Sequence, residues 1–203
     1  MKRIRLHNFL VLFIFTLIFH SNGTGQDIHF SQFNQSPLRL NPALTGQFDG
    51  SYRVAGIFRS QWRSITTPYS TVAFSGDAKN FLKQNGVGAG IDFFYDKAGD
   101  GNLGTININL SGSYTVNIGT SNKNKLTGGV QMGWARRQID PTQLVFDNQN
   151  GGGASLENFE TGKSFINLNA GVLWQTKFES RKILQIGVAT HNLTQPDINF
   201  YEN

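Results

Sequence analysis

A strict alternation of apolar and polar side chains runs through residues 103–118 (LGTININLSGSYTVNI). Ile106 and Ile108 belong to the apolar set, and Asn107 and Asn109 belong to the polar set between them. Because successive side chains of a strand point to opposite faces, the pattern predicts a strand with one face suited to lipid or a core and one suited to water. The stretch is also about twice as long as the usual strand of a globular protein. Both properties are typical of a transmembrane, antiparallel outer-membrane β-barrel.

Six further segments carry a two-residue period, although the alternation over 69–78 is poor and leaves the facing of that strand open. The predicted strands cover residues 51–59, 69–78, 86–95, 103–118, 125–137, 164–177 and 183–191. Bacterial barrels have short periplasmic turns and longer outer loops. If the first strand runs outward, the connections 79–85, 119–124 and 178–182 are periplasmic. The longest connection, 138–163, is then extracellular.

Residues 1–25 have the composition of a cleaved export signal. Basic residues lie within positions 2–5, an apolar run fills positions 9–19, and small residues at Gly23 and Gly25 suit cleavage before Gln26. The apolar run is too short for a transmembrane helix, which needs roughly 20 residues. We therefore expect a signal peptide over 1–25, an N-terminal periplasmic segment over 26–50 and an outer-membrane β-barrel over 51–203.

The number of predicted strands is odd, whereas single-chain bacterial barrels have an even number. An open sheet would also leave strand edges exposed to lipid, where no water can satisfy them. We therefore favour an incomplete barrel, in which 51–203 forms the N-terminal half of a longer one. The alternative is that the strands close by pairing with another chain.

The composition argues against an enzyme and against a nucleic-acid partner. Charged residues make up only 15% of the chain, glycine and phenylalanine are frequent, and the net charge of +5 includes the signal peptide. The chain contains none of the common nucleophile, zinc or phosphate-binding motifs, so we expect neither a metal site nor a cofactor. The absence of cysteine excludes lipoprotein processing and disulfides. The polar faces of the strands carry candidates that either line a pore or pair inside a filled interior: Arg53, Arg59, Asp92 and Arg137.

Seven short strings of residues resemble one known family. They are residues 26–33 (QDIHFSQF), 40–46 (LNPALTG), 52–54 (YRV), 59–62 (RSQW), 69–71 (YST), 75–77 (SGD) and 189–196 (ATHNLTQP), the last with Asn192 as an insertion. The sequence thereby resembles the PorP/SprF family of the Bacteroidetes type IX secretion and gliding systems. Family members are typically about half as long again as this chain, which agrees with the incomplete barrel.

The resemblance implies a non-enzymatic outer-membrane β-barrel that is an accessory of type IX secretion and gliding. The implied partners are components of the periplasmic secretion ring, a secreted adhesin whose export or surface attachment it supports, and outer-membrane lipid. Two other classes stay open. A passive porin or small-solute transporter would need an open lumen, and a soluble exported β-sandwich is disfavoured by the long strands with a wholly apolar face.

The residues that match the family motif near the N-terminus are candidates for a periplasmic docking or plug segment. They are Phe30, Ser31, Gln32, Asn41, Pro42, Ala43 and Gly46. The alternative is purely structural: Asn41 and Pro42 set the turn into the first strand, and Phe30 and Phe33 pack against the base of the barrel.

Overall fold

The computed structural model describes most of the chain beyond its first 34 residues. The described residues are 35–64, 68–99, 101–119, 123–140, 161–179, 182–196 and 200. All of them belong to one of the two compact units of the chain, Gln32–Asn203. The predicted signal peptide, Phe30, Ser31, Gln32 and most of the longest loop lie outside the described residues.

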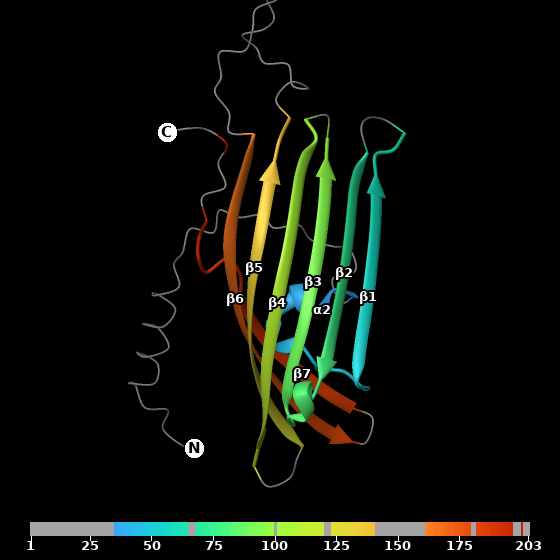
Figure 1. Ribbon diagram of the computed structural model, residues 1–203. Helices are drawn as coiled ribbons and strands as arrows, with labels where there is room; N and C mark the ends of the chain where they lie inside the picture. Colours follow the sequence, from blue (N-terminus) through green and yellow to red (C-terminus); the bar gives the residue numbers. More distant parts are fainter. Residues whose placement is uncertain are drawn as a thin grey trace, which may run out of the picture. The chain divides into compact units, whose positions relative to one another are not determined.

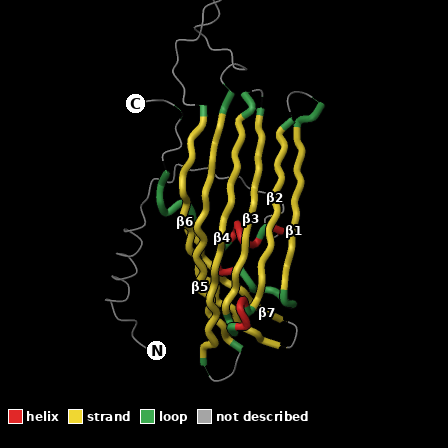
Figure 2. The backbone as a smooth tube through the Cα atoms, viewed as in Figure 1, coloured by secondary structure: helices red, strands yellow, loops and turns green. Residues whose placement is uncertain are grey.

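The unit is a single antiparallel sheet in which every strand pairs with the next strand in sequence (Figure 1). The strands are β1 (Tyr52–Gln61), β2 (Tyr69–Lys79), β3 (Val87–Ala98), β4 (Leu103–Ile118), β5 (Asn124–Gln138), β6 (Gly162–Glu179) and β7 (Lys182–Thr190). Figure 2 shows that the sheet curls along its length, so that β6 and β7 swing behind the other strands. The fold is an all-β half-barrel, as the alternation predicts, and the bounds of β4 match the prediction residue for residue.

The middle strands, β2 to β6, expose apolar side chains on the convex face and bury polar side chains on the concave face. In β4, Leu110 is 59% exposed, whereas Asn109 is 3% exposed. The same inversion holds in β5, where Met132 is 57% exposed and Gln131 is 2% exposed. A soluble sheet would bury the apolar face instead, so this arrangement suits a convex face in lipid.

The register aligns inward residues into rows that cross the sheet. One row joins Asp92 of β3, Asn109 of β4, Gly133 of β5 and Asn167 of β6 through successive strand pairs. The facing of β2, which the sequence leaves open, is also clear: Ser75 and the other odd-numbered residues from 71 to 77 are buried, whereas Val72 and Phe74 are exposed. A two-residue period fixes this facing because a slip of one residue would invert the whole strand.

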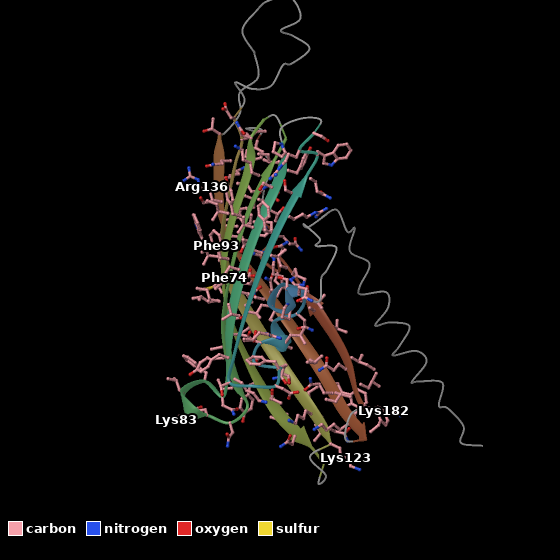
Figure 3. The ribbon with its side chains drawn as sticks, turned by 90° about the vertical axis from the view of Figure 1, so that its right-hand side faces the viewer. Phe74, Lys83, Phe93, Lys123, Arg136 and Lys182 are labelled. Atoms are coloured by element: carbon pink, nitrogen blue, oxygen red, sulfur yellow. The ribbon has the colours of Figure 1, made fainter. Side chains whose placement is uncertain are left out.

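One short α-helix and two short 3-10 helices complete the described structure. They are α2 (Pro37–Leu40), η2 (Pro42–Leu44) and η3 (Phe81–Lys83), the last in the connection between β2 and β3. Among the described residues, no helix has the length and apolar character that crossing a membrane requires. Figure 3 shows α2 and η2, in blue, inside the curl of the sheet.

Candidate functional site

The segment that precedes β1 lies across the concave face, and we call residues 36–48 the inner strap. Two prolines shape it, since each occupies a first helical turn, where its missing N–H is not needed: Pro37 in α2 and Pro42 in η2. Between them, Asn41 is extended and ends α2. Its Oδ1 accepts a hydrogen bond of 2.8 Å from the backbone N of Ala43, which caps η2.

An ion pair between β1 and β2 holds the C-terminal end of the strap. Arg53 donates two hydrogen bonds to Asp77, from Nε to Oδ1 at 2.9 Å and from Nη2 to Oδ2 at 2.7 Å. Asp77 Oδ2 also accepts from the backbone N of Gly46 at 2.7 Å, and Arg53 Nη2 donates to the carbonyl of Leu44 at 3.1 Å. The Arg53 guanidinium lies 4.7 Å from the centre of the Phe48 ring. Because the Asp77 side chain is 1% exposed, this pair forms in a nearly dry environment, where such bonds are strong.

A second ion pair holds the N-terminal end of the strap. Arg39 Nη1 lies 3.2 Å from Oδ2 of Asp92 in β3, whose side chain is fully buried. Asn109 Nδ2 donates to the same oxygen at 2.9 Å, and the Arg39 guanidinium lies over the Phe94 ring at 4.2 Å. The strap is therefore fixed at both ends by an arginine–aspartate pair that also stacks on an aromatic ring.

The middle of the strap binds the remaining strands. Ser113 of β4 donates to the carbonyl of Thr45 at 2.6 Å, and Gln131 of β5 donates to the carbonyl of Leu38 at 3.3 Å. Asn41 Nδ2 donates to the carbonyls of Val172 and Val188, at 3.3 Å each, and so joins β6 to β7. The strap thus has a polar contact with every strand of the sheet.

Inward-facing glycines let the strap approach the sheet backbone. The glycine floor consists of Gly88, Gly90, Gly129, Gly171 and Gly187. A Cβ atom on Gly129 would lie under 3.0 Å from the backbone of Pro42 and Ala43, and one on Gly171 would collide with the Asn41 amide. Any larger residue at these two positions would displace the strap.

The structure places the predicted site residues in three groups. Asn41, Pro42, Ala43 and Gly46 belong to the inner strap and are buried against the sheet of their own chain. Arg53 and Asp92 point inward and bind strap residues, as described above. Arg59 and Arg137 are half-buried, and strand register puts Arg137 on the inward row of Thr105 and Lys163, nearer the opposite end of the sheet.

Two charged residues of the site are not singled out by the sequence. Arg39 lies outside the matched strings, and Asp77 lies within one of them (75–77) without a role being assigned to it. Only the three-dimensional structure shows their partners. The sequence does give a weak signal for the glycine floor. The alternation of β5, β6 and β7 places Gly129, Gly171 and Gly187 on the inward face of their strands. Among the described residues, no group of three or more histidine, cysteine, aspartate or glutamate side chains is arranged to hold a metal.

Comparison with known proteins identifies the family. No curated protein and no solved structure matches the chain. Residues 22–203 match the family described as "Type IX secretion system membrane protein PorP/SprF", which confirms the resemblance found in the sequence motifs. The half-barrel with an apolar convex face agrees with a membrane protein. The chain belongs to the PorP/SprF family of type IX secretion system membrane proteins.

Proposed function

We propose that this protein is a non-enzymatic outer-membrane accessory of type IX secretion. In this proposal it supports the export or surface attachment of secreted adhesins and contacts the periplasmic secretion ring. Family membership supports a role in this secretion system. The apolar convex face supports a location in the outer membrane, the membrane that is spanned by β-barrels.

The inner strap is the observation that favours an accessory over a pore. A passive porin needs a water-filled lumen along its whole length. Here the strap crosses the concave face, binds all the strands of the sheet and is held by two ion pairs. A concave face occupied in this way suits a protein that holds a partner better than one that conducts solutes.

The proposed docking segment has two parts, one that anchors it to the sheet and one that contacts the secretion ring. Asn41, Pro42, Ala43 and Gly46 are buried, so in this proposal they fix the segment to the sheet. Phe30, Ser31 and Gln32 precede the strap and would carry the contact with the ring. This division fits residues 26–50 as an N-terminal segment that acts on the periplasmic side.

Deletion of the gene in its natural host tests the proposal. We expect the cells to lose one or a few surface adhesins, measured by surface labelling and by mass spectrometry of the secreted fraction. Complementation with the wild-type gene should restore these adhesins. A triple alanine variant at Phe30, Ser31 and Gln32 should restore the folded barrel to the membrane but not the adhesins to the surface. Unchanged adhesins together with a loss of small-solute uptake would instead support the porin alternative.

A further inference from the structure

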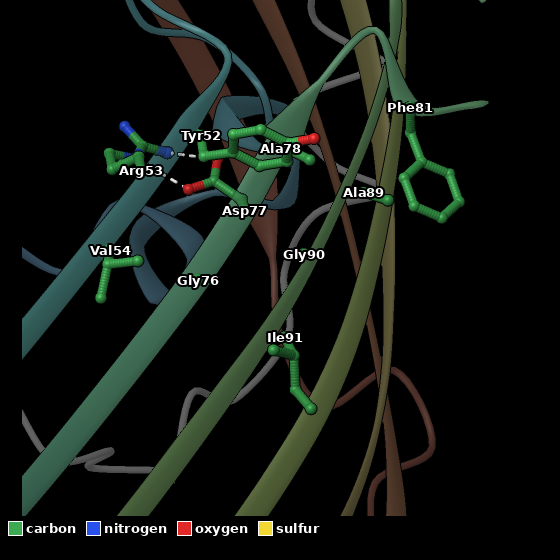
Figure 4. A pocket seen from close by; sticks show the side chains of 10 residues that line it. All are labelled: Tyr52, Arg53, Val54, Gly76, Asp77, Ala78, Phe81, Ala89, Gly90 and Ile91. Carbon is green, nitrogen blue, oxygen red and sulfur yellow. Dashed lines mark hydrogen bonds and ion pairs between the residues drawn. The ribbon is translucent and has the colours of Figure 1, made fainter. Parts of the chain in front are cut away.

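A groove of about 370 Å³ opens on the convex face across β1, β2 and β3 (Figure 4). Its floor is made by small residues, since strand register aligns Ala78 with Ala89 and places Gly76 beside them. Larger side chains stand around this floor: Tyr52, Val54, Phe81 and Ile91. The result is a shallow hollow between larger apolar side chains.

The groove ends at the connection between β2 and β3, which has an unusual backbone. Asn80, Leu82 and Lys83 have positive φ angles of 53°, 54° and 62°. Residues other than glycine rarely adopt this conformation, and it persists only where the surroundings impose it. The turn exposes 44% of Phe81 and 76% of Leu82, and Lys83 is exposed beside them. Two apolar side chains and one ammonium group are thus displayed next to the groove.

This end of the sheet is basic. Lys83, Lys123 and Lys182 all lie at the end that carries the short turns, as Figure 3 shows. Short turns mark the periplasmic side of an outer-membrane barrel. The end of the groove therefore falls where the hydrocarbon of the inner leaflet meets its phosphate groups, and lysine at this level attracts anionic headgroups.

We propose that the groove binds an acyl chain of one phospholipid of the periplasmic leaflet, with its phosphate beside Lys83. In the membrane, lipid covers the apolar convex face, and the small residues of the floor leave room for a chain between the larger side chains around them. The turn supplies the complementary charge. The site is independent of the accessory role proposed above and rests on the convex face being in the membrane with the short turns on the periplasmic side.

Lipid retained by the purified full-length protein tests the site. The protein is extracted in a mild detergent, washed, and its bound phospholipid is counted by mass spectrometry. Ala89→Phe fills the groove, and Ala170→Phe is the matched control, since Ala170 is an outward small residue of β6 far from the groove in the strand order. We expect wild type and Ala170→Phe to retain phospholipid and Ala89→Phe to lose at least about fivefold, because the buried methylenes no longer fit.

Lys83→Glu supplies a second measurement that leaves the sheet intact. It should lower retention of anionic phosphatidylglycerol more than retention of phosphatidylethanolamine. Heat-modifiable gel migration shows which variants are folded, and only those are compared. Equal retention by folded wild type and folded Ala89→Phe overturns the proposal. So does a wild-type dimer that Ala89→Phe dissociates, because a second copy would then cover the groove.

Discussion

Asp77 shows how one buried carboxylate joins the inner strap to the sheet. Arg53 lies directly opposite Asp77 in the β1–β2 ladder, so strand pairing already brings the two charges together. The second oxygen of Asp77 is then also available to the backbone N of Gly46. Replacing the carboxylate by an amide would remove the counter-charge of a half-buried arginine and leave one oxygen where two accept hydrogen bonds now. Such losses at a buried ion pair are among the most costly single changes.

Asp77→Asn should therefore lower the free energy of unfolding by about 2 to 3 kcal/mol. The measurement is the urea midpoint of the protein refolded in detergent micelles, followed by gel migration without heating. Asp49→Asn is the control, because Asp49 is exposed and lies just beyond the strap. Equal midpoints for the two variants would show that the ion pair does not stabilise the strap.

Two adjacent glycines of β5 provide a sharper comparison at the same scale. Gly129 faces the strap, whereas a Cβ atom on Gly128 would meet nothing within 4 Å. Gly129→Ala should destabilise the protein by about 1 to 3 kcal/mol, as overfilled sites usually do. Gly128→Ala should be neutral or slightly stabilising, because it restricts the unfolded chain without a clash. The same urea titration measures both, and a reversed order would mean that the strap does not sit on the floor in solution.

At the scale of elements, the strands were predictable from the sequence and the strap was not. A two-residue period over β4 or β5 shows directly which face of the sheet each side chain occupies, because each side chain meets either lipid or the interior. The strap has no such period. Its conformation depends on partners far away in sequence, such as Val188, which is 147 positions from Asn41. Local propensity marks Pro37 and Pro42 as turn or helix-start residues, but it does not say what they pack against.

Asn41 links the strap to the edge of the sheet, so its loss should act on one element more than on others. Asn41→Asp retains an oxygen that caps Ala43 but removes the donor to Val172 and Val188. We expect faster amide hydrogen exchange in β7 and at the paired part of β6, with exchange in β4 unchanged. Asn41→Ala removes the cap as well, and should also speed exchange in η2. Uniform acceleration across the sheet would contradict a local link.

At the scale of the whole molecule, the convex face supports contact with lipid, and the concave face supports a filled interior. The convex face was predictable, since a wholly apolar face on a long strand has few uses other than lipid contact. The sequence left open whether inward charges line a pore or pair inside a filled interior. The structure pairs Arg53 and Asp92 with residues that include the strap, which favours the filled interior over that part of the concave face.

Permeability of the outer membrane follows from a filled concave face. Cells that produce the wild-type protein should take up a chromogenic β-lactam no faster than cells that lack the gene. The double variant Arg39→Ala and Arg53→Ala removes both ion pairs of the strap, so we expect faster uptake at equal protein abundance. Gly128→Ala, which leaves the strap contacts intact, should behave as wild type. Fast uptake with the wild-type protein would show that the strap does not seal the interior. This result would favour a passive porin over an accessory of secretion. Slow uptake with both proteins would mean that the ion pairs are not what keeps the interior closed, and that the glycine floor and Asn41 suffice.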